Sequence, residues 1–241
     1  MKPTLSPDEI SVLRQASAYP EDASASGGVE RVQTHISDVF LTARRVYKFR
    51  KAVDLGFVRF RDVAERNQDC LRELTLNRRL APDVYLGVAP LRGRGEAARI
   101  GPLSEALSGQ GASAPEHCVV MRRLPAGRDA LSLLEAGRLG AELLDRLALR
   151  IARFHDEVSL GTPAPFDPEA WRDVCTRPFR ESLDVMGSSG GAPLARPAIA
   201  AVARRADAFV ALHGGRFEAR RRAGSAVDGH GDLHLQHVWF E

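Results

Sequence analysis

The sequence predicts an α+β protein of two lobes, in which a strand-rich first part is followed by a mainly helical second part. Segments rich in β-branched and aromatic residues occur before residue 125, and apolar residues recur at intervals of three and four after it. Hydrophobic residues make up 44% of the 241 residues and charged residues 27%, a composition typical of a chain that buries its own core. We therefore expect a first lobe over residues 1–122 and a second over residues 123–241.

The first thirty residues or so predict a short helix and a loop. Ser6 precedes Pro7, Asp8 and Glu9, and these residue types favour the N-terminus of a helix. Residues 21–28 are rich in Ser, Ala and Gly, so we expect a loop there.

A hairpin and a helix are expected next in the first lobe. Val32–Leu41 and Arg45–Phe49 are rich in β-branched and aromatic residues, and only Thr42, Ala43 and Arg44 separate them. This pattern predicts an antiparallel hairpin. Apolar spacing predicts a helix over residues 62–80. The remaining strands are expected at Val84–Val88, near Ala98–Ile100, and at His117–Met121.

The second lobe is expected to be helical. Residues from Ala130 to about Val158 predict one helix, because apolar side chains recur on one face of it. These side chains are Leu139, Leu143, Leu147, Ile151 and Phe154. Gly187–Gly191 is expected to be a linker, and Pro197–Leu212 a further helix.

Charge, hydropathy and cysteine usage exclude several classes of protein. The net charge of +3 is too small to favour a nucleic-acid partner. No apolar run approaches the ~18 residues that a membrane span needs, and the first residues lack the apolar segment of a secretory signal. Cys70, Cys118 and Cys175 are widely spaced, so we expect a cytoplasmic protein without disulfides, with Cys118 inert in the core.

The most informative segment is His230–His237, just before the apolar run Val238–Phe240. An aspartate followed five residues later by a metal ligand suits phosphoryl transfer. In that chemistry Asp232 accepts the proton of the attacking hydroxyl, and His237 reaches a magnesium ion on the phosphates. The same hypothesis needs a lysine on an early strand to bind the phosphates and a helix glutamate to hold it; Lys48 and Glu73 occupy those positions.

Five motifs follow one another along the chain: Thr34–Ser37, Val46–Lys48, Glu73 with Leu76–Pro82, Met121–Pro125 and His230–His234. In this order they resemble the aminoglycoside phosphotransferase family, and more narrowly its uncharacterised bacterial branch that is often fused to a P-loop ATPase. The resemblance runs from about residue 10 to the end of the chain.

The resemblance implies a protein-kinase-like two-lobed fold, with an antiparallel-sheet N-lobe that carries one helix and a mainly helical C-lobe. It also implies ATP, Mg²⁺ and a small hydroxylated acceptor, with a P-loop ATPase domain as a partner in a longer gene product. Lys48 would bind the α- and β-phosphates and Glu73 would orient it. The remaining site residues would be Met121 and Leu124 in the hinge beside adenine, and Asp232 as the catalytic base in a loop shared with His230.

The chain departs from the family pattern in three places. Thr34–Ser37 stands where kinases have a glycine-rich loop, so phosphate contacts are expected from backbone N–H groups and from hydroxyls such as that of Ser37. His237 stands where the family has a metal-binding asparagine, and imidazole suits magnesium poorly. The chain ends before the family's magnesium-chelating aspartate and acceptor-binding helices, so we expect an incomplete C-lobe in a truncated form or fragment, and the acceptor is not predicted.

Two alternatives remain open from the sequence. The first is a nucleotide-binding or interaction module without catalysis, similar to a pseudokinase. The second is a metal-dependent hydrolase that uses His230, His234 and His237, because histidines four residues apart can share a helix face. The glutamate of a zinc-protease HExxH motif is missing there, and Gly231 weakens any helix.

Overall fold

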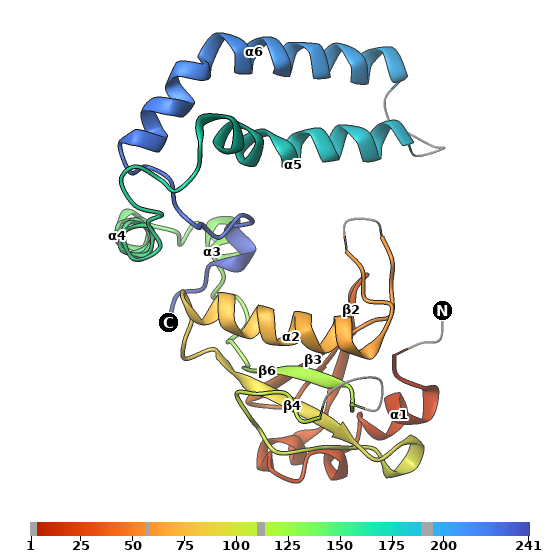
Figure 1. Cartoon of the computed structure of the whole chain (residues 1–241). Coiled ribbons are helices and arrows are strands. Elements are labelled where there is room, and N and C mark those ends of the chain that lie inside the picture. Colours follow the sequence, from red (N-terminus) through yellow and green to blue (C-terminus); the bar gives the residue numbers. More distant parts are fainter. Residues whose placement is uncertain (1–3, 56–57, 110–113, 189–194) are drawn as a thin grey trace. The chain divides into compact units, whose positions relative to one another are not determined.

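The chain folds into two units in a computed structural model that describes residues 4–55, 58–109, 114–188 and 195–241 (Figure 1). The first unit comprises Met1–Arg138 together with Leu235–Glu241, and the second comprises Leu139–His234. The α+β class is confirmed. The units differ from the expected lobes, because the division falls after Arg138 rather than after residue 122 and the last residues return to the first unit.

An antiparallel sheet forms the centre of the first unit. Among the described residues it has six strands in the order β1-β2-β3-β6-β4-β5. All neighbouring strands run antiparallel. The strands are β1 (Glu30–Gln33), β2 (Ser37–Leu41), β3 (Arg45–Arg50), β4 (Tyr85–Arg92), β5 (Arg99–Ile100) and β6 (His117–Arg122).

The segment Val32–Leu41, predicted as one strand, is divided by a turn into β1 and β2. The Thr34 hydroxyl accepts a hydrogen bond from the backbone N–H of Ser37 at 3.0 Å, and the Thr34 N–H donates one to the Ser37 carbonyl at 2.9 Å. A Thr side chain that bonds to nearby backbone offers an alternative to extended pairing, which is why the β-branched composition misled the prediction. The predicted hairpin is therefore part of a three-stranded meander.

Alternating residues of β3 face two different layers. Tyr47 and Phe49 are buried in a cluster that includes Leu13 and Phe40. Lys48 and Arg50 point to the other face, where each bonds to helix α2 (Val63–Arg78). Figure 1 shows α2 along this face of the sheet, and a second apolar cluster of Cys70, Leu74, Val88 and Val119 attaches it. Because successive side chains of a strand point to opposite faces of the sheet, one face of β3 lies in the core and the other lies beneath α2.

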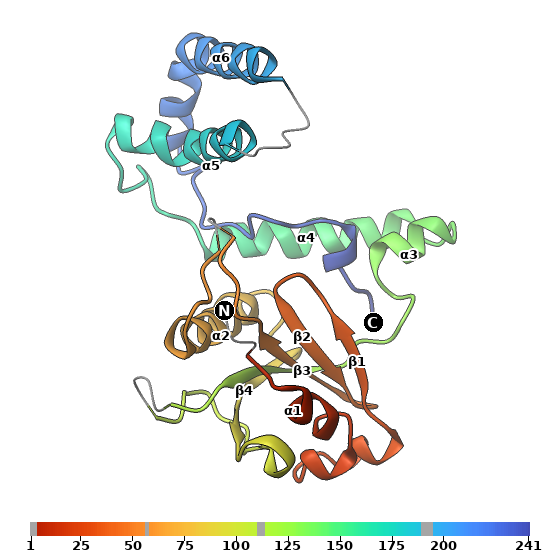
Figure 2. The same ribbon diagram turned by 90° about the vertical axis from the view of Figure 1, so that its right-hand side faces the viewer.

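The N-terminal residues cover the opposite face of the sheet (Figure 2). Helix α1 (Pro7–Val12) begins as predicted, with a reciprocal cap between Ser6 and Glu9. The predicted loop over residues 21–28 is wrong in part, because Ala23–Gly27 forms a 3-10 helix. Asp22 caps that helix by accepting the Ser24 N–H at 3.0 Å, which explains how a Ser- and Gly-rich segment becomes regular.

The single helix predicted from Ala130 to Val158 is two helices, α3 (Ala130–Glu135) and α4 (Ala141–Glu157). Gly137 has a φ of +66°, a left-handed conformation that ends a helix and that glycine adopts without strain. Gly140 then stands at the N-cap of α4. The apolar periodicity continues across the break, which is why it predicted one element.

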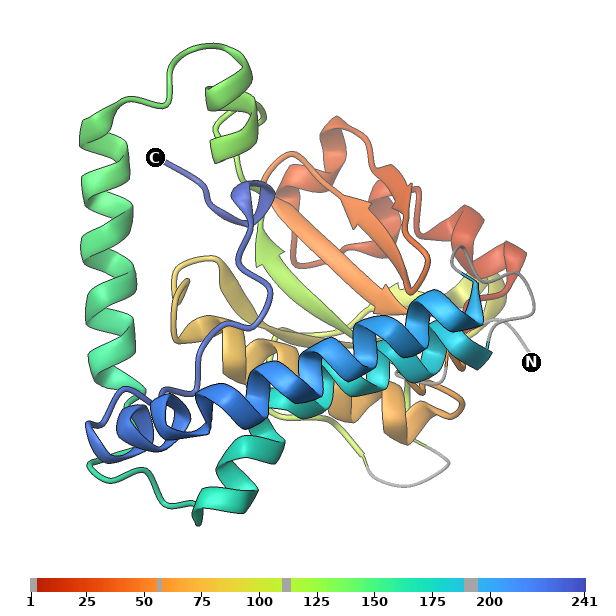
Figure 3. The same ribbon diagram turned by 90° about the horizontal axis from the view of Figure 1, so that it is seen from above.

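The second unit contains α4 together with α5 (Pro168–Ser188) and α6 (Arg196–Arg222), and Figure 3 shows the last two side by side. The Trp171 indole N–H donates to the Phe217 carbonyl at 2.9 Å and joins them. The predicted linker Gly187–Gly191 is wrong at Gly187 and Ser188, which are helical, and residues 189–191 lie outside the described residues. The described part of the chain contains no helix with the length and apolar character needed to cross a bilayer.

Candidate functional site

Lys48 and Glu73, predicted from the sequence as a pair, are brought together by β3 and α2. The Lys48 Nζ atom lies 2.9 Å from Glu73 Oε1. The Lys48 side chain is 25% exposed, whereas that of Glu73 is 8% exposed. The carboxylate is therefore fixed inside the unit, and the ammonium group, which has three N–H donors, retains access to an anionic ligand.

A second cation, which sequence reasoning missed, shares the same carboxylate. Arg50 Nη2 bonds to Glu73 Oε2, and Arg50 Nε lies 2.6 Å from Asp69 Oδ2. The guanidinium group also lies over the Phe60 ring, 5.4 Å from its centroid. Two signals could have indicated this contact: Arg50 follows Lys48 by two residues, and Asp69 precedes Glu73 by four.

Ser37 is fully buried beneath the β1–β2 turn, and its Oγ atom accepts a hydrogen bond from Arg50 Nη1 at 3.1 Å. The predicted contact of the Ser37 hydroxyl with a phosphate therefore does not fit this structure, because the hydroxyl is used internally. Thr34 and His35 are the exposed residues of the turn. Lys51 Nζ donates to the Thr34 carbonyl at 2.7 Å and holds the turn in place.

The two residues predicted to line the hinge lie at and beyond the end of β6. Met121 pairs with Val46 on one side and with Tyr85 on the other. Leu124 is half-buried and follows the strand. The segment between them is held by the Arg123 N–H, which donates to the Arg44 carbonyl at 2.8 Å. The structure places both residues at the C-terminal end of β6, an interior strand of the sheet, and their contact with adenine stays a prediction.

The part of the predicted catalytic loop from His230 to His234 lies outside helices and strands in the second unit. Asp232 is exposed, and its backbone N–H donates to His230 Nδ1 at 3.2 Å. Gly231 between them has a φ of +77°, which glycine adopts readily. Just before the loop, the Asp228 N–H donates to the Val158 carbonyl at 3.0 Å. His230 thus supports the loop that carries Asp232.

The residues after the loop are attached to the start of α3 in the first unit. The Ala130 N–H donates to the Val238 carbonyl at 2.8 Å, and the Phe240 N–H donates to the Arg128 carbonyl at 3.0 Å. Arg122, next to Met121, bonds to the Glu241 carboxylate through Nη2 at 2.7 Å. The short segment from Leu235 is therefore anchored on the strand that contains one hinge candidate.

Two side chains of the predicted catalytic loop could contact one metal ion. Asp232 and His234 of the second unit offer ligand atoms within 4.8 Å of one another. His237 lies in a short 3-10 helix, Leu235–His237, of the first unit. Imidazole is a softer ligand than the oxygen atoms that magnesium prefers, and the metal role of His237 and the cluster of His230, His234 and His237 stay predictions.

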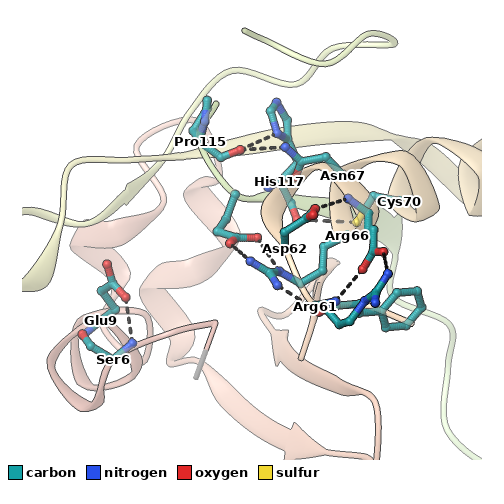
Figure 4. Close-up of polar contacts among 12 residues, drawn as sticks. Ser6, Glu9, Arg61, Asp62, Arg66, Asn67, Cys70, Pro115 and His117 are labelled. Carbon is teal, nitrogen blue, oxygen red and sulfur yellow. Dashed lines mark hydrogen bonds and ion pairs between the residues drawn. The ribbon is translucent and has the colours of Figure 1, made fainter. Parts of the chain in front are cut away.

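A buried polar cluster attaches the first half of α2 to β6 and the residues before it (Figure 4). Arg66 bonds to both carboxylate oxygens of Glu116, and Asn67 Nδ2 donates to the Pro115 carbonyl at 2.9 Å. The His117 N–H donates to Asn67 Oδ1 at 2.9 Å. These contacts involve none of the predicted site residues, so we assign them to stability.

His117 is held in its neutral form within this cluster. The Ser108 N–H donates to His117 Nε2 at 3.0 Å, so that nitrogen is an acceptor, and Nδ1 donates to the Pro115 carbonyl at 3.0 Å. Burial lowers the pKa of His117 below its usual value. Protonation would place an N–H on Nε2, so that two hydrogen-bond donors, this N–H and that of Ser108, would face each other.

The buried cysteines are inert, as predicted for Cys118. Burial raises the pKa of the Cys70 thiol to about 12 and that of Cys118 well above its ordinary value. Neither residue is a thiolate near neutral pH, and the structure gives neither a role as a nucleophile.

Comparison with known proteins adds relatives but no described activity. No family model matches the chain, and no solved structure matches it. It is similar to uncharacterised proteins of Mycobacterium bovis and of two strains of Mycobacterium tuberculosis, each 30% identical over 201 residues. The alignment covers 83% of this chain and 37% of each relative, so the chain spans little more than a third of their length.

Proposed function

We propose that this chain is part of an ATP-dependent phosphotransferase with a protein-kinase-like fold, related to the aminoglycoside phosphotransferases. It would transfer the γ-phosphate of ATP to a hydroxyl of a small molecule. The observation that carries the proposal is the Lys48–Glu73 ion pair between β3 and α2, formed between two residues that the sequence order had selected. The mycobacterial relatives are longer than this chain. We propose a P-loop ATPase domain as a partner in a longer gene product.

Lys48 is the proposed phosphate ligand. Its ammonium group is partly exposed and carries both a positive charge and N–H donors, which suit the oxygens of the α- and β-phosphates. Glu73 restricts the ammonium group to one position, so that less conformational freedom is lost on binding. Met121 and Leu124 are proposed to contact adenine at the C-terminal end of β6.

Asp232 is the proposed catalytic base. Its exposed carboxylate would accept the proton of the acceptor hydroxyl as the new O–P bond forms. His230 would act through the loop, because it accepts the Asp232 backbone N–H. Mg²⁺ bound to ATP would neutralise the phosphate charge. The described loop offers Asp232 beside the imidazole of His234, which fits magnesium poorly, so we assign no set of protein ligands to that ion.

A nucleotide-binding module without catalysis is the second candidate. The observation that favours it is the imidazole of His237 in place of an amide oxygen, because imidazole suits magnesium poorly. A module of this kind would bind ATP through Lys48 in the same way, without dependence on magnesium.

Thermal-shift titration with ATP, with and without Mg²⁺, tests the proposal. We expect ATP to raise the melting temperature of the unmodified chain and of Arg44→Met, which removes an exposed cation on the β2–β3 turn. We expect Lys48→Met to abolish the shift. A Mg²⁺-dependent shift supports the enzyme, and a shift indifferent to Mg²⁺ supports the module. A chain that shows no shift with ATP would contradict both.

A further inference from the structure

Arg50 uses all three of its guanidinium nitrogens inside the first unit. Nε lies 2.6 Å from Asp69 Oδ2, Nη1 lies 3.1 Å from Ser37 Oγ, and Nη2 bonds to Glu73 Oε2. The side chain is only 9% exposed. Because a planar guanidinium presents its donors in fixed directions, these contacts define its position closely.

The contacts of Arg50 tie three elements together. Arg50 belongs to β3, Ser37 to β2, and Asp69 and Glu73 to α2. Asp69 and Glu73 lie four residues apart, which places them on the same face of the helix one turn from each other. Arg50 therefore holds α2 at two points along its length, and the second of these points is the carboxylate that bonds to Lys48.

The two oxygens of Glu73 are divided between the two cations. Oε1 faces Lys48 Nζ at 2.9 Å, and Oε2 faces Arg50. A carboxylate held through one oxygen can rotate about its terminal bond, whereas one held through both has a fixed plane. The contact with Arg50 thus determines where Oε1 lies, and with it where the Lys48 ammonium group is held.

A second buried arginine on the same helix provides a matched comparison. Arg66 bonds to both oxygens of Glu116 and to the Phe60 carbonyl, so it also ties α2 to other parts of the first unit. Both arginine side chains are buried to a similar degree. Arg66 bonds to neither Lys48 nor Glu73. A comparison of Arg50 and Arg66 variants therefore distinguishes loss of helix attachment from loss of lysine positioning.

We propose that Arg50 is a positioning residue for the phosphate-binding lysine: its guanidinium fixes the Glu73 carboxylate so that Lys48 is presented to a triphosphate. This inference rests on the proposed function and extends it to a residue that would not itself contact the nucleotide. The inference predicts a selective effect on ligand binding: removal of Arg50 weakens binding of the phosphates and leaves binding of the nucleoside unchanged.

The test compares the dissociation constants for ATP and for adenosine in four proteins: the unmodified chain, Arg50→Met, Lys48→Met and Arg66→Met. We expect Arg50→Met to weaken ATP binding by ~10-fold, the size of one weakened charge-assisted hydrogen bond, with adenosine binding unchanged. Lys48→Met should show the same selectivity with a larger effect. Arg66→Met should leave the ratio of the two constants unchanged. Circular dichroism confirms that each variant is folded.

Two further variants keep the test decisive if Arg50→Met does not fold. Arg50→Lys retains a cation that can reach Glu73 but cannot bond to three partners, so it should keep more ATP affinity than methionine does. Asp69→Asn weakens one guanidinium contact at a carboxylate that is only partly buried, and should show a smaller selective loss.

The outcomes separate failure of this inference from failure of the proposed function. Unchanged ATP affinity in the Arg50 variants, or an equal loss of ATP and adenosine affinity, overturns the positioning role while ATP binding by the unmodified chain still stands. If the unmodified chain binds no ATP, the proposed function fails and the inference falls with it.

Discussion

The two units of the chain hold their candidate residues in opposite surroundings. In the first unit, Glu73 and its cations are bonded within a layer between β3 and α2. In the second unit, Asp232 is exposed in a loop. The difference teaches that Glu73 contributes to the stability of its unit as well as to the proposed site, whereas the exposed carboxylate of Asp232 is expected to contribute less to stability.

The apolar residues of the two units differ in the same way. Phe40 and Phe49 of the first unit are fully buried, whereas Phe209 and Leu212 on α6 are 56% and 79% exposed. Burial of apolar area is the main favourable term in folding. The first unit therefore obtains more of its stability from a packed core, and the second relies on fewer buried side chains.

The largest expected effect is on catalysis by the second unit. Asp232→Asn in the proposed longer gene product should lower kcat by ~10²–10⁴-fold, the usual contribution of a general base. The free energy of unfolding should change by less than about 0.5 kcal/mol, because the side chain is exposed. Turnover is measured as ATP consumption, and stability by urea denaturation. Unchanged turnover would remove Asp232 from the mechanism.

The next effect compares the two cores directly. Phe49→Ala should lower the free energy of unfolding by about 3–5 kcal/mol, because the removed ring leaves a cavity in a packed cluster. Phe209→Ala should change it by about 0.5 kcal/mol or less, because the ring is already largely in water. Denaturation in urea measures both, and equal losses would show that the two units are stabilised alike.

A smaller loss is expected when the Glu73 charge is removed. Glu73→Gln should destabilise the first unit by ~3 kcal/mol, near the lower end of the cost of breaking a buried ion pair, since Lys48 is partly exposed. The amide preserves the shape of the side chain, as it does in Asp232→Asn. If both amide variants were equally stable, the contrast between the buried and the exposed carboxylate would be wrong.

The smallest expected effect is on the pH dependence of stability. Because burial lowers the pKa of His117, the unfolded chain binds this proton more readily than the folded chain does. The stabilising contribution is thus complete above the unfolded pKa of ~6.5 and is lost as the pH falls toward the lower pKa of the folded state. His117→Gln should flatten the dependence of unfolding free energy on pH in this window. A slope that persists in the variant would assign it to other groups.

The sequence predicted much of the first unit because its strands and helix follow simple periodicities. The errors lie where a local interaction competes with periodicity: the hydroxyl of Thr34 makes a turn inside a β-branched segment, and Gly137 interrupts an apolar repeat. Neither signal is visible in a pattern of hydrophobic spacing alone.

Part of the candidate site could be predicted in the same way, and part could not. The order of motifs selected Lys48 and Glu73, which the structure brings together. Arg50 was missed because its partners lie on two other elements, and only the pairing of β2 with β3 and the placement of α2 brings Ser37 and Asp69 to it. The roles of Met121, Leu124 and Asp232 remain predictions, since they depend on ligands.

Protection of Lys48 from acetylation tests the central claim most directly, namely that its ammonium group binds the phosphates of ATP. The rate of Lys48 acetylation would be measured by peptide mass spectrometry with no nucleotide, with adenosine, and with ATP and Mg²⁺. The account expects ATP with Mg²⁺ to slow the reaction of Lys48 strongly, and adenosine to leave its rate unchanged. Equal rates of acetylation with and without saturating ATP would contradict it.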